Sequence, residues 1–175
     1  YHDAGHTVGG RPSPEHDPVY KVTIMPRGRA LGVTFYLPEG DRYSTSKRQL
    51  ESRLTSVFGG RVAEQIIFGS ESVTTGAQSD IEHATKLARS MVTCWGFSDR
   101  LGPLAYGEDQ EEVFLGHSVS RSKHISDETQ RIVDEEVRTL IDGGYQRAEK
   151  ILRANMPILH AMAEGLLKYE TLESS

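Results

Sequence analysis

The stretch STSKRQLESRLTSVFGGRVAEQIIFG, residues 44–69, decides the fold class because it predicts one long amphipathic helix. Residues 44–46 are good N-cap residues, and Gly69 is a natural helix stop. Between them the apolar residues recur mostly at steps of three and four: Leu50, Leu54, Val57, Phe58, Val62, Ile66 and Ile67. Each member of the Gly59-Gly60 pair destabilises a helix interior by roughly 1 kcal/mol relative to Ala, which indicates a close helix crossing or backbone approach.

The same spacing predicts further helices toward the C-terminus. One covers about 79–96, and a longer one covers 127–154. Asp127 with Gln130 resembles a capping box at the start of the longer helix. Residues 155–157 include a proline that ends this helix and starts another, so the last third is expected to be an antiparallel helical pair.

Two stretches before the central helix have the alternation of strands. Residues 19–25 and 31–37 place apolar side chains at every second position, and residues 26–29 between them read as a turn. The second stretch either forms a plain core strand, which we favour, or pairs with an extended peptide as an added strand. Helix breakers at 9–14 end a short opening helix. The sequence therefore predicts a mainly α fold with a small β-sheet and a C-terminal helical pair.

Length and charge restrict the domain organisation and the partners. The 175 residues predict one domain, 1–175, with a candidate metal-site part at 1–100 and a C-terminal helical part at 125–172. The formal charge of -5 argues against a broad basic face, so nucleic acid is not an expected partner. The single cysteine, Cys94, cannot form an internal disulfide, and we expect it to be a small buried side chain.

The chain opens with a histidine pair that could bind a metal ion. His2 and His6 are four residues apart, so on a helix both imidazoles project from one face, as in the zinc motif His-Glu-x-x-His. With 7 histidines in the chain, about 0.3 such pairs are expected by chance. An exposed, solvated pair is therefore the alternative. The acidic Asp3 and the small Ala4 and Gly5 between the histidines favour the metal site.

A catalytic zinc ion needs three protein ligands and one open position. Asp80, His83 and Glu64 are all chemically suitable as the third ligand, and sequence spacing does not choose between them. Each also has an ordinary structural explanation. Asp80 would be favoured at a helix N-terminus by the macrodipole, and Glu64 could be a solvated helix charge.

Several longer segments are more specific than the histidine pair alone: His2-Asp3-Ala4-Gly5-His6, Glu15-His16-Asp17-Pro18, Pro26-Arg27-Gly28-Arg29-Ala30-Leu31-Gly32, Gly59-Gly60-Arg61-Val62-Ala63-Glu64, Thr75-Gly76-Ala77-Gln78-Ser79-Asp80, Trp95-Gly96-Phe97-Ser98 and Leu167-Lys168-Tyr169-Glu170-Thr171. In these segments the chain resembles the proteolytic domain of the FtsH family, the membrane-bound ATP-dependent zinc metalloproteases of peptidase family M41, and the resemblance covers nearly its whole length. The resemblance implies a helical zinc metallopeptidase domain. It implies Zn²⁺ held by His2, His6 and Asp80, with Glu64 behind them orienting an imidazole.

The sequence departs from the family at the position of the general base. The family has Glu where this chain has Asp3, which withdraws the carboxylate by about one C–C bond, roughly 1.5 Å. A general base must lie within about 2.6–3.2 Å of its proton donor, so we expect zinc binding with hydrolysis lowered by roughly 10²–10⁴. The alternative is a catalytically impaired or inactive assembly ring that binds unfolded chains and keeps the zinc site.

The resemblance also implies a larger protein. It implies a homohexamer at the bacterial inner membrane, with the protease domain facing the cytoplasm. The expected substrates are unfolded or misassembled membrane proteins and short-lived cytoplasmic proteins. ATP and Mg²⁺ would be used by an ATPase region, since no Gly-x-x-x-x-Gly-Lys-Ser/Thr loop occurs in these 175 residues. We expect that region and the transmembrane helices to lie upstream of Tyr1.

Overall fold

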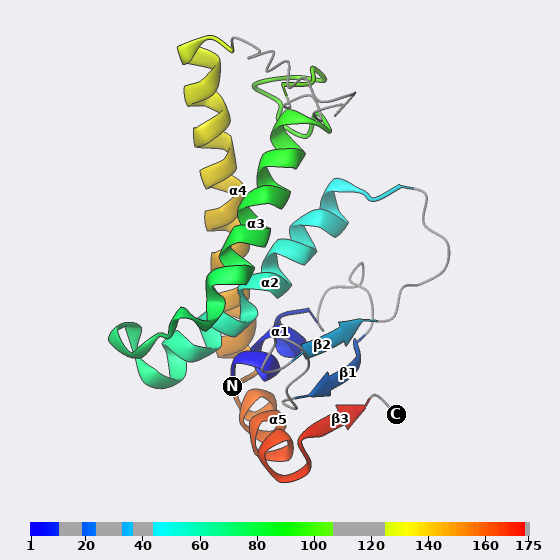
Figure 1. Cartoon of the computed structure of the whole chain (residues 1–175), viewed down its shortest axis with the longest axis vertical. Helices are drawn as coiled ribbons and strands as arrows, with labels where there is room; N and C mark the ends of the chain where they lie inside the picture. The colour runs from blue at the N-terminus through cyan, green and yellow to red at the C-terminus, as the bar shows by residue number, and fades with distance from the viewer. Residues whose placement is uncertain (11–18, 24–32, 37–43, 107–124, 174–175) are drawn as a thin grey trace, which may run out of the picture.

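The structure, a computed structural model, describes residues 1–10, 19–23, 33–36, 44–106 and 125–173. These residues form a mainly α domain with one small sheet (Figure 1). The elements are α1 His2–Gly10, β1 Val19–Thr23, β2 Val33–Tyr36, α2 Lys47–Phe68, two single-turn 3-10 helices at Ser70–Ser72 and Thr75–Ala77, α3 Gln78–Thr93, α4 Asp127–Ala154, α5 Met156–Tyr169 and β3 Thr171–Glu173. The predicted fold class is confirmed.

Helix α2 begins and ends where the sequence predicts. The Ser46 side chain accepts a hydrogen bond from the backbone N–H of Gln49, and the Gln49 side chain accepts one from the backbone N–H of Ser46. This reciprocal capping box satisfies two backbone donors that the first turn would otherwise leave unpaired. At the other end Gly69 has a φ of 81°, a conformation that few residues other than glycine adopt easily.

Helix α1 crosses α2 at the predicted glycine pair. A Cβ atom built on Gly59 would collide with the carbonyl oxygen of Gly5, and one built on Gly5 would collide with the carbonyl oxygen of Gly59. Gly9 continues this close contact, because its Cβ position lies 3.5 Å from the Gly59 Cα atom. The two backbones therefore approach closely, and α1 can carry its histidines directly against α2.

Replacing Gly59 with Ala is expected to destabilise the protein by about 1–3 kcal/mol, the usual effect of overpacking. The obstructing atoms belong to the Gly5 backbone, so no side-chain rotation can relieve the collision. Urea denaturation measures the change. The control is Gly143→Ala in α4, where the new methyl would meet only a flexible Arg147 nitrogen at 3.4 Å and the better helix propensity of Ala should prevail. Equal stability of the two variants would contradict the tight crossing.

One apolar core joins all five helices. Val8 of α1, Leu54 of α2, Met91 of α3, Leu152 of α4 and Leu159 of α5 belong to one cluster of buried side chains. Each of the five is at most 2% exposed. The histidine-bearing helix is thus held by the same core that holds the helix carrying Asp80.

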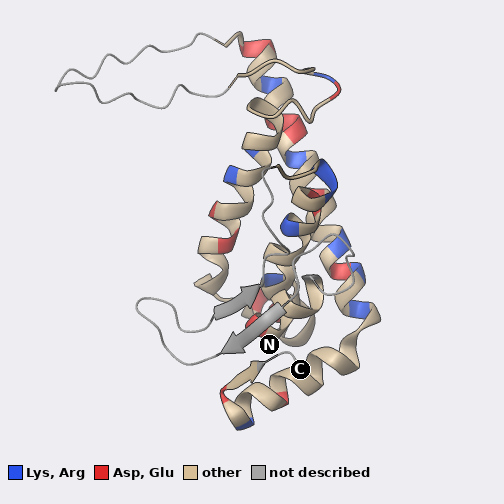
Figure 2. Cartoon of the chain, turned by 90° about the vertical axis from the view of Figure 1, so that its right-hand side faces the viewer, with Lys and Arg blue, Asp and Glu red and all other residues tan. Residues whose placement is uncertain are grey.

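Helix α4 runs beside α3 in the opposite direction (Figure 1). Val92 of α3 and Val133 and Val137 of α4 form a second apolar cluster between them. Lys and Arg are interspersed with Asp and Glu along these helices (Figure 2), and Arg89 of α3 forms an ion pair with Asp134 of α4 at 3.7 Å.

Among the described helices, none combines the length and apolar character that a membrane crossing needs.

The C-terminal helices differ from their expected pairing. Both exist, but α4 packs mainly on α2 and α3, while α5 packs against α1. Only Asn155 separates α4 from α5, and one residue is too short for the reversal that an antiparallel helical hairpin needs. The antiparallel partner of α4 is therefore α3.

Two local predictions are also corrected. The N-cap of α4 is Ser126, whose hydroxyl accepts from the backbone N–H of Thr129, so Asp127 is the first helical residue and not the cap. Ser126 has the extended backbone that an N-cap needs, and its short side chain reaches the first turn. Cys94 is exposed because it lies at the C-cap of α3, beyond the buried face of that helix.

The sheet has the strand order β2-β1-β3, with both pairings antiparallel. The predicted pairing of β1 with β2 is confirmed over shorter strands, and residues 24, 25, 31, 32 and 37 lie outside the described residues. Strand β3 was not predicted, because three residues are too short to show an alternation. In the described sheet β2 is an edge strand, and addition of a substrate strand to it stays a prediction.

Candidate metal centre

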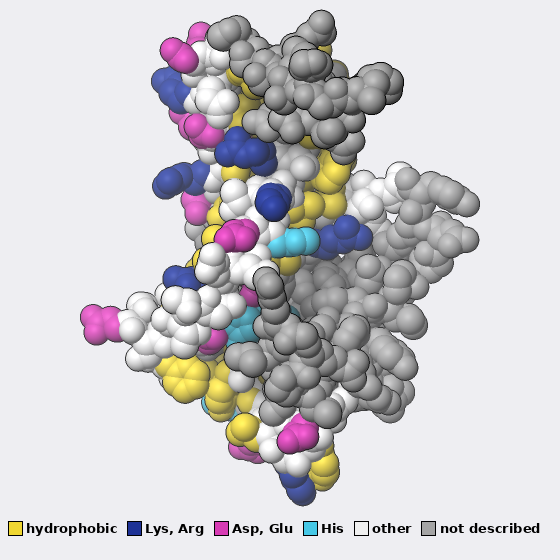
Figure 3. Space-filling view, viewed as in Figure 1, with side chains coloured by type: hydrophobic (Ala, Val, Ile, Leu, Met, Phe, Trp, Pro, Cys, Tyr) yellow, Lys and Arg dark blue, Asp and Glu magenta, His cyan; other side chains and the backbone are white. Residues whose placement is uncertain are grey.

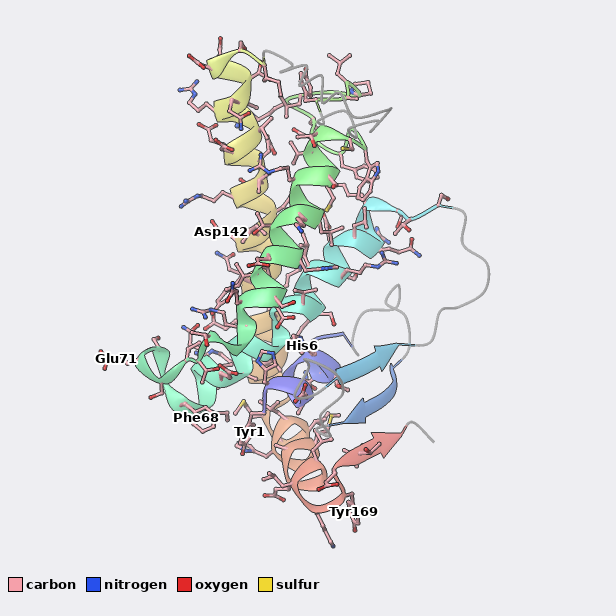
Figure 4. The ribbon with its side chains drawn as sticks, in the orientation of Figure 1. Tyr1, His6, Phe68, Glu71, Asp142 and Tyr169 are labelled. Carbon is pink, nitrogen blue, oxygen red and sulfur yellow. The ribbon has the colours of Figure 1, made fainter. Side chains whose placement is uncertain are left out.

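The two histidines of α1 lie side by side against α2. The helix is hydrogen bonded from its first turn, since the backbone N–H of Gly5 donates to the carbonyl of Tyr1 at 2.8 Å. The Nε2 atoms of His2 and His6 are 3.1 Å apart. Figure 4 shows the labelled His6 where α1, α2 and the start of α3 come together.

The Nδ1 atom of each imidazole has a fixed partner. His2 Nδ1 lies 2.9 Å from Oε1 of Glu64, and His6 Nδ1 lies 2.9 Å from the backbone carbonyl oxygen of Ser56. A carbonyl oxygen and a carboxylate only accept, so each neutral imidazole carries its proton on Nδ1 and presents the lone pair of Nε2. This is the arrangement that metal-binding histidines commonly have.

Asp80 completes a group of three from the first turn of α3. Its Oδ2 atom is 3.1 Å from His2 Nε2 and 3.3 Å from His6 Nε2. Four ligands around zinc at bonds of about 2.0 Å are separated by roughly 3.3 Å from one another. The two nitrogens and the oxygen therefore have the spacing of three corners of a tetrahedron, and the donor set fits Zn²⁺.

The three ligand groups are neither deeply buried nor free in solvent. The exposed fractions of the side chains are 24% for His2, 15% for His6 and 27% for Asp80. Figure 3 shows a histidine side chain at the surface at the place where Figure 4, in the same orientation, labels His6. An ion held here would have access from one side, as a catalytic metal site requires.

The pKa values show how strongly the groups are coupled. Burial alone would lower the pKa of His2, but its hydrogen bond with Asp80 and the nearby negative charges, those of Glu64 and Asp3 included, outweigh burial and raise this pKa. Burial would raise the pKa of Asp80, but the protonated imidazoles of His2 and His6, which donate hydrogen bonds to its carboxylate through Nε2 and carry positive charge, hold this pKa well below its usual range. The surroundings of His2 are therefore negative, which favours a bound cation.

Glu64 is buried behind His2. It is 8% exposed, and its carboxylate has a second partner in Thr74, whose backbone N–H donates to Oε2 at 3.2 Å and whose hydroxyl donates to the same oxygen at 3.3 Å. The Thr74 hydroxyl also accepts from the backbone N–H of Gly76 at 3.2 Å. Thr74 thus connects Glu64, which holds His2, to the turn that leads into α3 and Asp80.

Sequence reasoning missed Thr74 and Ser56. Thr74 lies in a Ser/Thr/Gly-rich stretch whose composition indicates only a loop. Ser56 contributes its backbone carbonyl, which no residue type identifies. Neither contact has a signal in one sequence that could have found it.

Two other residues considered in the sequence analysis, Asp3 and His83, are not among the three converging ligand groups. Asp3 is half-buried on α1 next to His2, and its charge is near enough to raise the pKa of that histidine. His83 is exposed on α3 and is not part of the group. Across the described residues, His2, His6 and Asp80 are the only three His, Cys, Asp or Glu side chains whose ligand atoms all lie within 4.8 Å of one another.

Comparison with known proteins gives a consistent result. The model of peptidase family M41 matches residues 1–175. A protein named ATP-dependent zinc metalloprotease FtsH from Buchnera aphidicola subsp. Schizaphis graminum is 60% identical over 174 residues, which are 99% of this chain and 28% of that relative. Proteins of the same name from Haemophilus influenzae and Caulobacter vibrioides are 59% and 55% identical, over 99% and 98% of this chain and 27% and 28% of their own length. The chain spans little more than a quarter of each of these relatives.

Proposed function

The chain belongs to peptidase family M41, and from this premise we propose that it is a zinc-dependent endopeptidase domain whose metal ligands are His2, His6 and Asp80. The observation that carries the proposal is the convergence of three ligand atoms from α1 and α3 within 4.8 Å. Residues 1–175 would act as one peptidase unit.

The ligand residues and their supports have separate tasks. His2 Nε2, His6 Nε2 and Asp80 Oδ2 would hold the ion, while Glu64 and the Ser56 carbonyl fix the two rings through Nδ1. Bound zinc supplies Lewis acidity, which polarises a scissile carbonyl and lowers the pKa of a water molecule. The single negative charge of Asp80 leaves the centre positive overall, which suits the binding of a carbonyl oxygen.

Asp3 is proposed as the general base. Its carboxylate would accept the proton of the attacking water and pass it to the leaving amine. Its side chain is shorter than the Glu of the family by about 1.5 Å, and we propose that this distance reduces hydrolysis. The position of Asp3 directly after His2 on a helix pinned by the Gly5–Gly59 crossing supports this, because the backbone has little freedom to advance the carboxylate.

Zinc content per chain, measured together with casein cleavage, tests the proposal. One zinc per chain with slow cleavage is the expected result. A chain that binds no stoichiometric zinc would contradict it. A chain with one zinc and no cleavage would favour the second candidate, a non-catalytic ring that holds unfolded polypeptides, for which the Asp at position 3 is the specific observation.

Replacing Glu64 with Gln is expected to lower zinc affinity roughly 10–100-fold, the usual effect of removing a support of a ligating histidine. The amide has one acceptor oxygen where the carboxylate has two, so it cannot serve both His2 and Thr74 equally. Competition with a chromophoric chelator measures the affinity. Glu82→Gln is the control, because Glu82 is exposed on α3 and touches no ligand. Equal affinity of the two variants would remove Glu64 from the site.

The names of the relatives describe ATP-dependent zinc metalloproteases, and the family resemblance carried by the sequence motifs implies the rest of the whole protein. We propose a homohexamer anchored in the bacterial inner membrane, with this domain facing the cytoplasm. Its substrates would be unfolded or misassembled membrane proteins and short-lived cytoplasmic proteins. ATP and Mg²⁺ would serve an ATPase region of that protein.

A further inference from the structure

We infer that Gly60 is a positioning residue of the metal centre, because only a residue without a side chain at this place leaves room for both ligating imidazoles. The inference rests on the proposed zinc site and deepens it. It concerns the Nε2 atoms of His2 and His6, which α2 supports from behind.

The space at Gly60 is filled by the two imidazole rings. A Cβ atom built on Gly60 would lie 2.7 Å from His6 Nε2, 2.7 Å from His2 Cε1 and 2.8 Å from His2 Nε2. These are the three nearest atoms, and all belong to the candidate ligands. At the neighbouring Gly59 the three nearest atoms are all backbone atoms, two from Gly5 and the Cα atom of His6 at 3.1 Å. The two adjacent glycines therefore serve different purposes, one for the helix crossing and one for the ligands.

The backbone of α2 does not itself require glycine at this position. Gly60 is helical and is not among the residues with positive φ. Alanine would improve the helix by its better propensity. The explanation for a glycine here is therefore the space beside it, and that space belongs to the metal site.

The rings cannot move aside without changing the site. His2 is held through Nδ1 by Glu64, and His6 is held through Nδ1 by the Ser56 carbonyl. The two rings also contact each other edge to face, with centroids 4.7 Å apart. A methyl group at position 60 would have to break an Nδ1 hydrogen bond or change the 3.1 Å spacing of the Nε2 atoms. Either movement takes a ligand away from its place beside Asp80.

The test is Gly60→Ala compared with the unchanged chain and with Gly143→Ala. Gly143→Ala is the control for helix propensity, since its methyl lies far from the ligands in α4. Three quantities are measured: zinc affinity by chelator competition, the visible absorption spectrum of the Co²⁺-substituted protein, and the urea midpoint of the metal-free protein. Gly60→Ala is expected to bind zinc at least about 10-fold more weakly and to shift the Co²⁺ bands. Its metal-free midpoint should fall less than that of Gly59→Ala, because the collision at Gly60 is with side-chain ends and the collision at Gly59 is with backbone atoms.

The other outcomes separate this inference from the proposed function. If the unchanged chain binds zinc and Gly60→Ala binds it equally well with the same Co²⁺ spectrum, the inference is overturned and the zinc site stands. If metal-free Gly60→Ala fails to fold, the methyl collides with the fold and not with the ligands, which also overturns it. If the unchanged chain binds no zinc, the proposed function fails and this inference fails with it.

Discussion

Replacing Asp3 with Glu is expected to raise peptide hydrolysis by roughly 10²–10⁴ while leaving one zinc per chain, since that is the usual contribution of a well-placed general base. Glu keeps the charge and extends the carboxylate by about 1.5 Å, toward the water that the proposed general base would deprotonate. Helix α1 cannot make up this distance by shifting, because Gly5 is locked against Gly59 in α2. Casein cleavage and zinc content, measured in the same preparation, give the comparison.

The control for this variant is Asp142→Glu in α4, an exposed position outside the metal centre (Figure 4). It makes the same chemical change and should leave cleavage unchanged. If the chain and its Asp3→Glu variant cut casein at the same rate, the length of the residue-3 side chain does not limit the reaction. The zinc ligands would be unaffected by that result.

Replacing Asp80 with Asn is expected to weaken zinc binding by roughly 10²–10³. Four-ligand structural sites gain about 10–16 kcal/mol from zinc, which is about 2.5–4 kcal/mol per ligand, and every 1.4 kcal/mol is tenfold. Asn keeps the shape of the side chain but removes the charge that faces His2 and His6. Hydrolysis should fall with the zinc content. Isothermal titration with zinc measures the affinity.

Asp127→Asn is the control for Asp80→Asn, because it shows what the loss of a carboxylate at a helix N-terminus does by itself. Asp80 and Asp127 both occupy the first turn of a long helix, where the macrodipole favours a carboxylate by about 0.3–1 kcal/mol. Asp127→Asn should therefore change stability by that amount and leave zinc affinity unchanged. If the two variants had the same zinc affinity, Asp80 would be a helix-terminal residue only.

Local signals predicted most of the helices. The N-cap candidates at 44–46, the stop at Gly69 and the break at Pro157 are chemical properties of a few adjacent residues, and the ends of α2, α4 and α5 lie at or beside them. The prediction that α4 packs against α5 was wrong, because the packing of a helix depends on residues far apart in sequence. Val133 meets Val92 across 41 positions, and periodicity within either helix does not reveal its partner.

In the metal centre, too, local spacing predicted some features, and contacts between distant residues could not be predicted. The spacing of His2 and His6 predicts a shared face, because four residues make about one helical turn. Nothing in the spacing selects Asp80 over His83, although the structure places one beside the imidazoles and leaves the other exposed. The choice came from the resemblance to a family. Thr74 could not be found at all, since its role depends on how a loop folds over Glu64.

Anomalous X-ray diffraction at the zinc absorption edge tests the central claim most directly, because it locates the ion and its ligands together. We predict one zinc peak per chain, about 2.0 Å from Nε2 of His2, from Nε2 of His6 and from a carboxylate oxygen of Asp80. No peak at this place in zinc-containing crystals, or a peak held by other residues such as His83, would contradict the account.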